Sequence, residues 1–235
     1  MEPVFIEIHA LRQLFDDRLV EAGCKQAPDV RLCHDRCVIL PTTAAAIVAG
    51  GRARRYGGRD KSRLVVEGRP IIVRQIEVLR SIAAPVFVVG GAPNRFADVG
   101  LTVHPDRIEG LGAIGGIYTA IDVAEADRVV VVACDLPFLD AGMLARLVEL
   151  SEGHDGAWVR TGLGPEPLIA VYARTAGPAV RSAIDAGRLR AGALGDVLTM
   201  AEMTTEELAR FGPPERLIAN VNSPEDFARV QLPAS

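Results

Sequence analysis

Short runs of β-branched residues alternate with helix-like segments along most of this chain, and this alternation narrows the folds open to it. The clearest run is DRVVVVACD (Asp127 to Asp135), whose four successive valines suit a strand that is buried on both faces. The alternation predicts an α/β fold in three layers, α/β/α, with a mostly parallel central sheet. The other strands expected in this part are AAAIVAG, PVFVVGG and LTVHPD, and the helices are PIIVRQIEVLRSI (Pro70 to Ile82), AIGGIYTAIDVAEA and AGMLARLVELSE.

The rhythm is less regular after residue 155. GAWVR and PLIAVYA predict two strands, and TAGPAVRSAIDAG predicts a helix that Pro178 interrupts near its start. A last short strand is expected to end at IANVN, and a last helix to run through SPEDFARV. We interpret residues 43–235 as one domain.

Residues 1–42 are predicted to form a separate N-terminal extension that is helical or partly disordered. CHDRC (Cys33 to Cys37), with Cys24 upstream, has some features of a metal-binding knuckle. Zinc sites usually pair their ligands in two clusters with set spacings, and the sequence has no second cluster. An extension without a metal is therefore the favoured interpretation.

The charge balance argues against several classes of function. The formal net charge is −4 and the pI is about 5.6, whereas a nucleic-acid-binding domain usually carries a basic face. The longest uncharged run, Cys37 to Gly51, is too short to cross a bilayer. The N-terminus carries acidic residues early and lacks the basic start of a signal peptide. We expect a cytoplasmic protein that binds neither nucleic acid nor membrane.

A glycine- and arginine-rich segment, GGRARRYGGRDK, directly follows the first expected strand. In open α/β sheets ligands sit beyond the carboxyl ends of the strands, and glycines let the backbone approach a pyrophosphate closely. Neither the dinucleotide fingerprint nor the P-loop fits, because the glycines come in adjacent pairs and Lys61 follows Asp60 rather than a glycine. A solvated basic loop is the alternative. We predict a phosphate site, with charge supplied by Lys61 and one or more of Arg52, Arg54 and Arg55.

Two carboxylates are expected at the same edge of the sheet. Asp135 ends the four-valine strand, where it is well placed to hold Mg²⁺ on the phosphates of a substrate. Its alternative role, capping the helix that begins near Asp140, is disfavoured by its distance from that helix in the sequence. Asp106 follows the third strand and points to the same edge. Cys134 is interpreted as a small buried residue, since no paired histidine is evident.

Five blocks in order resemble the molybdenum cofactor guanylyltransferases, which belong to the nucleotidyltransferases with a Rossmann-like sheet. The blocks are VAGGRARRYGGRDK, GAIGGI, CDLPF, EPLIAVY and NVNSPE. The resemblance covers about residues 44 to 230 and implies that residues 43–235 are a nucleotidyltransferase domain. Tyr56 replaces a usual Met and Val48 a usual Leu, while some members carry Asn near Gly90. The N-terminal extension has no counterpart in the core family.

The resemblance also implies roles for single residues. Asp135 would hold Mg²⁺, Lys61 and Arg55 would meet the triphosphate, and Asn220 and Asn222 would lie near the acceptor. The residues implied to line the nucleotide are Val48, Ala49, Gly50, Gly51, Lys61, Gly90, Asp106 and Asp135.

The reaction implied is attack by the terminal phosphate of molybdopterin on the α-phosphorus of GTP, which releases pyrophosphate. The attacking phosphate is already ionised, so catalysis would consist of positioning and charge neutralisation rather than strong base catalysis. The implied partners are GTP, the molybdopterin cofactor and other proteins of cofactor biosynthesis or molybdoenzyme maturation.

Several alternatives stay open. Relatives that use CTP typically have an A-A-G loop start and a shorter arginine-to-lysine spacing, so the glycine pairs at 50–51 and 57–58 favour GTP. A sugar-phosphate nucleotidyltransferase is a second alternative. A nucleotide-binding regulator without catalysis is a third, although the presence of both Lys61 and Asp135 argues against it. A glycosyltransferase would need a D-x-D motif, whereas Leu136 and Pro137 follow Asp135.

Overall fold

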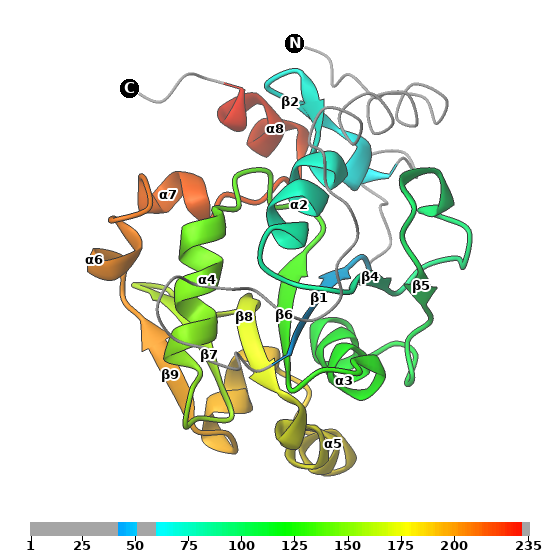
Figure 1. Ribbon diagram of the computed structural model, residues 1–235, viewed down its shortest axis with the longest axis vertical. Helices are drawn as coiled ribbons and strands as arrows, with labels where there is room; N and C mark the ends of the chain where they lie inside the picture. Colours follow the sequence, from blue (N-terminus) through cyan, green and yellow to red (C-terminus); the bar gives the residue numbers. More distant parts are fainter. Residues whose placement is uncertain (1–41, 51–59, 232–235) are drawn as a thin grey trace, which may run out of the picture.

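A computed structural model describes residues 42–50 and 60–231 of the chain, and within these residues a seven-stranded sheet forms the centre of the fold (Figure 1). The strand order is β5–β4–β1–β6–β8–β7–β9. β5, β4, β1 and β6 are parallel, β8 is antiparallel to both of its neighbours, and β9 is parallel to β7. The strands are β1 (Thr43–Val48), β4 (Val86–Val89), β5 (Val103–His104), β6 (Arg128–Ala133), β7 (Gly156–Thr161), β8 (Gly164–Ala173) and β9 (Met200–Met203).

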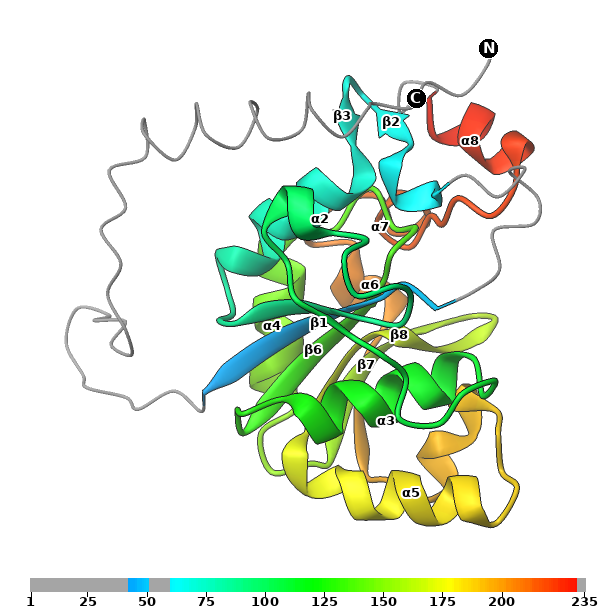
Figure 2. The ribbon, with the colours of Figure 1, turned by 90° about the vertical axis from the view of Figure 1, so that its right-hand side faces the viewer.

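Helices cover both faces of this sheet, as the alternation of strands and helices predicts. α2 (Ile71–Arg80) and α4 (Ala141–Leu150) contribute to the core on one face, and α3 (Ala113–Val123) and α5 (Gly177–Asp185) to the core on the other (Figure 2). The three-layer α/β/α prediction is therefore confirmed. Pro178 does not interrupt α5, because it lies in the first turn, where the missing N–H has no helical partner to lose.

The central strands are buried on both sides, which explains their composition. Ala45 and Ile47 of β1 face the α2–α4 side, while Ala44 and Ala46 face the α3–α5 side. The valines of β6 divide between the two cores in the same way. A strand enclosed by helices above and below has no solvent face, so the polar alternation of a half-exposed strand is missing.

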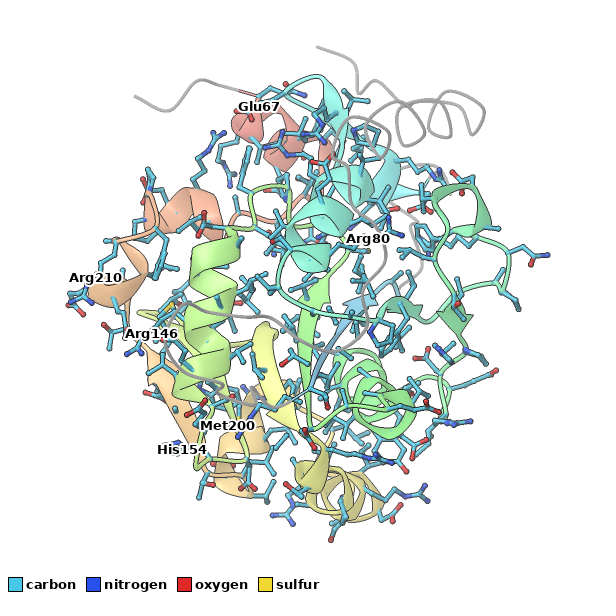
Figure 3. The ribbon with its side chains drawn as sticks, viewed as in Figure 1. Glu67, Arg80, Arg146, His154, Met200 and Arg210 are labelled. Carbon is cyan, nitrogen blue, oxygen red and sulfur yellow. The ribbon has the colours of Figure 1, made fainter. Side chains whose placement is uncertain are left out.

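A short hairpin adds a third cluster beside the main sheet. β2 (Val65–Val66) and β3 (Arg69–Pro70) turn through Glu67 and Gly68, both at positive φ, as a tight two-residue hairpin requires. The carboxylate of Glu67 (Figure 3) accepts hydrogen bonds from the guanidinium groups of Arg74 and Arg216, and so joins the turn to α2 and to α7 (Pro214–Leu217). The hairpin packs with α8 (Pro224–Val230) through Val66, Phe227, Val230 and neighbouring apolar residues.

Two expectations near the C-terminal end differ from the structure. The last strand predicted at IANVN is wrong: residues 218–222 have no strand partner, and the backbone N–H of Val221 donates instead to the carbonyl of Asp135 at 3.0 Å. The last strand is β9, whose sequence MAEM has no β-branched residue and gave no signal. The remaining short elements are η2 (Lys61–Arg63), η3 (Ala97–Val99), η4 (Arg174–Ala176), η5 (Ala191–Asp196) and α6 (Thr205–Leu208).

The predicted boundary between extension and domain falls at the edge of the described residues. Thr42 is tied to the start of β6, because its backbone N–H and its hydroxyl both donate to the Asp127 carboxylate at 3.0 Å. Residues 1–41 lie outside the described part, and the extension there stays a prediction. Among the described helices, none is both long enough and apolar enough to cross a membrane.

Candidate functional site

The carboxyl ends of β1, β4 and β5 bring three of the predicted nucleotide residues together. Gly90 follows β4 with φ +85°, and a Cβ built on it would lie 3.0 Å from the backbone nitrogen of Gly50 and 3.5 Å from the Oδ2 of Asp106. Gly50 follows β1, and Asp106 follows β5. The three residues therefore line one point at the edge of the sheet, and only a glycine at position 90 allows this approach.

The first strand also explains a glycine of the GAIGGI block. A Cβ on Gly116 of α3 would lie 2.6 Å from the Cγ1 of Val48, the last residue of β1. Real Cβ atoms do not approach so closely, so the glycine lets α3 pack directly on the strand end. The backbone after Val48, at Ala49 and Gly50, is the segment that the family resemblance implies to lie along the nucleotide.

Lys61 joins two blocks that are far apart in the sequence. It begins η2, and its Nζ donates to the Oδ1 of Asn222 at 2.9 Å. Its positive charge also acts on the Asp135 carboxylate. Asn222 thus lies beside the lysine, while Asn220 is exposed to solvent. Their predicted place on the acceptor side stays a prediction.

The position of Asp135 disfavours its ionised form. Burial raises the pKa of its carboxyl group above the usual value, Lys61 opposes this shift, and the negative charge of Asp226 adds a smaller contribution to it. Asp226 cannot move away freely, because its carboxylate accepts hydrogen bonds from the backbone N–H groups of Asn222 and Ser223 at the start of α8. A cation beside Asp135 would favour the ionised form of its carboxyl group.

The segment that carries Asp135 is held from α2. The side-chain amide of Gln75, itself buried, donates to the carbonyls of Ala133 at 2.7 Å and Leu136 at 3.0 Å. Arg74 donates from its Nε to the carbonyl of Pro137 at 2.9 Å. These bonds fix the turn after β6 independently of any ligand. Asp140 caps α4 by accepting from the N–H of Met143, so the capping role considered for Asp135 is already filled.

Cys134 takes no part in this chemistry. Burial, together with the neighbouring charge of Asp135, raises the pKa of its thiol to about 12. A thiol with such a pKa is protonated at neutral pH and is a poor nucleophile. Cys134 is half-buried and packs against the core on the α2–α4 side, so its interpretation as a small buried residue is confirmed only in part.

The donor set at Asp135 fits a magnesium ion that arrives with its substrate. In the part of the chain that the structure describes, no cluster of three or more His, Cys, Asp or Glu residues could hold a metal by itself. Magnesium is typically held by one or two carboxylates, with water and substrate phosphates as its other ligands. Asp135, a half-buried carboxylate at the end of β6, meets this requirement.

Arg95 is the residue at this edge that the sequence analysis missed. Its guanidinium forms two hydrogen bonds with the Asp60 carboxylate, both at 2.7 Å, and a third with the carbonyl of Ala49 at 2.8 Å. Burial alone would raise the pKa of the Asp60 carboxyl, but Arg95 holds it below its usual value. Its position in the sequence could have indicated it, because Arg95 follows β4 and the carboxyl end of β4 lies at the same edge of the sheet as Asp106.

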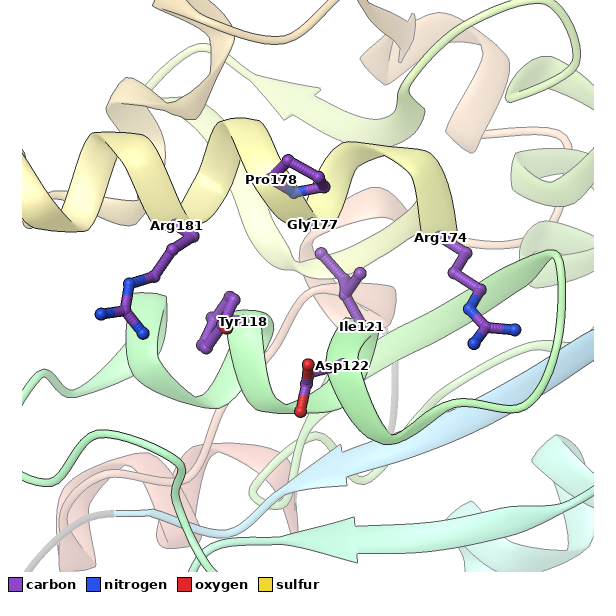
Figure 4. A pocket seen from close by; sticks show the side chains of 7 residues that line it. All are labelled: Tyr118, Ile121, Asp122, Arg174, Gly177, Pro178 and Arg181. Carbon is purple, nitrogen blue, oxygen red and sulfur yellow. The ribbon is translucent and has the colours of Figure 1, made fainter.

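Other predicted residues are not placed. Gly51, Arg52, Arg54 and Arg55 lie outside the described residues, and their phosphate contacts stay predictions. A separate open pocket of about 290 Å³ lies between α3 and α5 (Figure 4). Its lining contains none of the predicted site residues, and consists of Tyr118, Ile121, Asp122, Arg174, Gly177, Pro178 and Arg181.

Residues 45–197 match the MobA-like NTP transferase domain. The chain belongs to this family. The matched range runs from β1 to the end of η5, and so contains the strand end at Val48, Lys61 and Asp135.

Two curated members of the family cover most of the chain. A probable molybdenum cofactor guanylyltransferase from Pelotomaculum thermopropionicum is 33% identical over 189 residues, which are 80% of this chain and 91% of its own length. The molybdenum cofactor guanylyltransferase from Pseudomonas entomophila is 32% identical over 187 residues, covering 76% of this chain and 98% of its own. Both relatives are therefore aligned over almost their whole length.

Solved structures share the fold. The molybdopterin-guanine dinucleotide biosynthesis protein A from Archaeoglobus fulgidus superposes with a TM-score of 0.68 at 25% identity, covering 80% of this chain and 96% of its own. A CMP:2-keto-3-deoxy-manno-octonic acid synthetase in complex with CTP has a TM-score of 0.56 at 13% identity, covering 81% of this chain and 96% of its own. Since the second protein was solved with CTP, the fold alone does not decide which nucleotide a protein of this fold binds.

Proposed function

We propose that this protein transfers GMP from GTP to the terminal phosphate of the molybdopterin cofactor, forming the guanine dinucleotide form of the cofactor and pyrophosphate. The observation that carries the proposal is the contact between Lys61 and Asn222 beside Asp135. It joins the GGRDK, CDLPF and NVNSPE blocks, which come from three distant parts of the sequence, at one edge of the sheet. The names of the relatives point to the same activity.

In this mechanism each residue acts on charge or position. The backbone at Ala49 and Gly50 lies along the nucleotide, and Asp106 orients it from the neighbouring strand. Lys61 neutralises charge that builds up on the leaving pyrophosphate. Asp135 would hold a Mg²⁺ ion, which would supply positive charge at the phosphates of the nucleotide. The acceptor phosphate attacks the α-phosphorus in its ionised form, so the P–O bond to pyrophosphate breaks without a strong general base.

The test is pyrophosphate release by the purified protein with Mg²⁺ and each nucleoside triphosphate, with and without molybdopterin. We expect release with GTP only when molybdopterin is present. Release with a sugar phosphate in place of molybdopterin would support the alternative of a sugar-phosphate nucleotidyltransferase. Binding of GTP without release under any condition would support the alternative of a regulator. Because GTP is the proposed donor, we place the reaction in the cytoplasm.

The first prediction concerns the choice of nucleotide. We expect the protein to prefer GTP over CTP and ATP by about 10² in kcat/KM, the size of discrimination that a well-formed site commonly reaches. The paired glycines that start the GGRARRYGGRDK segment motivate the preference for guanine. Competition between GTP and CTP in one reaction measures the ratio directly. Equal pyrophosphate release from the two nucleotides would contradict the prediction and favour a cytidylyltransferase.

A second prediction tests the close approach at Gly90. The added Cβ of Gly90→Ala would lie 3.0 Å from the nitrogen and 3.1 Å from the Cα of Gly50, so the backbone beside the nucleotide must shift. We expect the KM for GTP to rise about tenfold or more, because small displacements of positioning groups have large effects. Gly153→Ala is the matched control. Gly153 has φ +74° and open space around it, so it carries the same backbone strain without the contact. A KM change of equal size in both variants would show that backbone strain, and not the contact with Gly50 beside the nucleotide, causes the effect.

A further inference from the structure

Arg95 connects the two sides of the site through one guanidinium group. Its Nε and Nη2 donate to the two carboxylate oxygens of Asp60, and its Nη1 donates to the carbonyl of Ala49. Ala49 follows β1, and Asp60 directly precedes Lys61. All three guanidinium nitrogens are therefore engaged within the protein, in the paired geometry that arginine, but not lysine, can form with a carboxylate.

Arg95 is itself held in place from two sides. Its guanidinium lies 4.8 Å from the ring centroid of Phe96, which is fully buried. Its backbone carbonyl accepts a hydrogen bond from Arg63 at 2.9 Å, and Arg63 also forms a two-point ion pair with Asp98. Since both Arg63 and Asp98 are largely buried, this second link is shielded from solvent. The guanidinium thus has little freedom to turn toward another partner.

These contacts anchor the residues on either side of Lys61 in the sequence. Asp60, before it, is bound by Arg95, and Arg63, after it, is bound to the 95–98 segment. Between them, the backbone N–H and the hydroxyl of Ser62 donate to the Oδ1 of Asp60 at 3.1 Å and 2.7 Å. The backbone of Lys61 is therefore fixed by both neighbouring residues, independently of the hydrogen bond from its Nζ to Asn222.

Gly91 leaves the space that this arrangement needs. A Cβ on Gly91 would lie 3.0 Å from the Nη1 and 3.2 Å from the Cδ of Arg95. The adjacent glycines after β4 thus serve two different contacts: Gly90 admits the backbone of Gly50, and Gly91 admits the side chain of Arg95. Neither contact depends on a bound nucleotide.

We propose that Arg95 is a positioning residue for the transfer reaction, which fixes the distance between the backbone at Ala49 and the ammonium group of Lys61. It acts through Asp60 rather than on the substrate, because each of its three guanidinium nitrogens already donates to a protein partner. The inference rests on the proposed function, since Lys61 is taken to meet the triphosphate. Misplacement of a catalytic group by about 1 Å can lower a rate by about 10².

The test is a double-mutant cycle of Arg95→Ala and Asp60→Asn, measured by steady-state kinetics with GTP and molybdopterin. We expect each single variant to lower kcat by about 30- to 100-fold with the KM for GTP changed by less than about threefold, since positioning is lost and not a phosphate contact. The double variant should be no slower than the slower single variant, because both changes break the same link. Arg146→Ala is the control, since Arg146 pairs with Glu149 and Glu207 on α4 and α6, away from the site.

A second readout does not depend on activity. Hydrogen exchange of the backbone amides of residues 60–64, without nucleotide, should become faster in Arg95→Ala and in the milder Arg95→Lys, and not in Arg146→Ala. If Arg95→Ala fails to fold, Arg95→Lys gives both the exchange and the kinetic result.

Rate losses that multiply in the double variant, or a KM that rises while kcat is kept, would overturn the proposal and indicate that Arg95 contacts the phosphates directly. Unchanged exchange would overturn it as well. A parent protein that releases no pyrophosphate from GTP, but shows the exchange difference, would contradict the proposed function and leave the link through Arg95 intact.

Discussion

Replacing Lys61 with alanine is expected to lower turnover with GTP by about 10²–10³, which corresponds to about 3–4 kcal/mol of transition-state stabilisation. The ammonium group is held beside Asn222 and close enough to Asp135 to act on its titration, so it is in place before substrate binds. A preorganised cation stabilises the charge that develops on the leaving pyrophosphate without having to reorganise. The measurement is single-turnover pyrophosphate release at saturating GTP and molybdopterin.

The same variant should keep a melting temperature close to that of the parent. Lys61 lies at the edge of the sheet and contributes nothing to the three apolar clusters. Arg210→Ala is a suitable control, because Arg210 carries the same charge at an exposed position after α6. Turnover within a few-fold of the parent would show that Lys61 has no role at the phosphates. A large drop in melting temperature would indicate that the lysine supports the fold instead.

The strands of the parallel part of the sheet and the helices that cover it could be predicted, because the strands are short continuous apolar runs and the helices are amphipathic segments between them. The valines of β6 and the alanines of β1 are apolar on both faces, which happens only inside a layered fold. The elements that were missed or misplaced lack such a signal. β9 is a short edge strand without β-branched residues, and it is fixed by its pairing with β7. The stretch at 218–222 has strand-like composition, but its hydrogen bond goes to one carbonyl after β6, and this tertiary contact cannot be predicted from local sequence.

The site could be predicted where the chemistry follows a strand. Asp106 and Asp135 were found because each follows a strand of the parallel part of the sheet, and such strand ends meet at one edge. Arg95 follows β4 by several residues and lies in no motif, so its link to Asp60 appears only when the chain is folded. The contact of Lys61 with Asn222 is of the same kind, since it spans 161 residues. Pairings across such distances are set by topology, which a local pattern does not contain.

The second large effect is expected for Asp135→Asn, which keeps the shape of the side chain and removes its charge. We expect turnover to fall by about 10²–10³ at fixed Mg²⁺, because the amide is a weaker magnesium ligand and the charge on the phosphates is then less well neutralised. A titration of the rate with Mg²⁺ checks the cause: the variant should need more metal for half-maximal rate. Adding Mg²⁺ and GTP together should raise the melting temperature of the parent more than that of the variant, since tighter binding to the folded state gives more stabilisation.

Without metal, Asp135→Asn should be more stable than the parent although it is less active. Burial raises the pKa of the Asp135 carboxyl in the folded state, so between its unfolded and folded pKa values the folded protein holds a proton that the unfolded chain has lost. As pH rises through this window, starting near the ordinary value of 3.8, the parent loses stability that Asp135→Asn retains. The difference in unfolding free energy should thus grow in favour of the variant and level off above the folded pKa. Urea unfolding of both proteins from about pH 4 to 8 measures it, and the other titrating groups cancel because the two chains share them. A variant that is slow and also less stable at every pH would mean that Asp135 serves the fold. A slow variant that is as stable as the parent or more stable, as expected here, is the behaviour of a carboxylate that serves a bound cation rather than the fold.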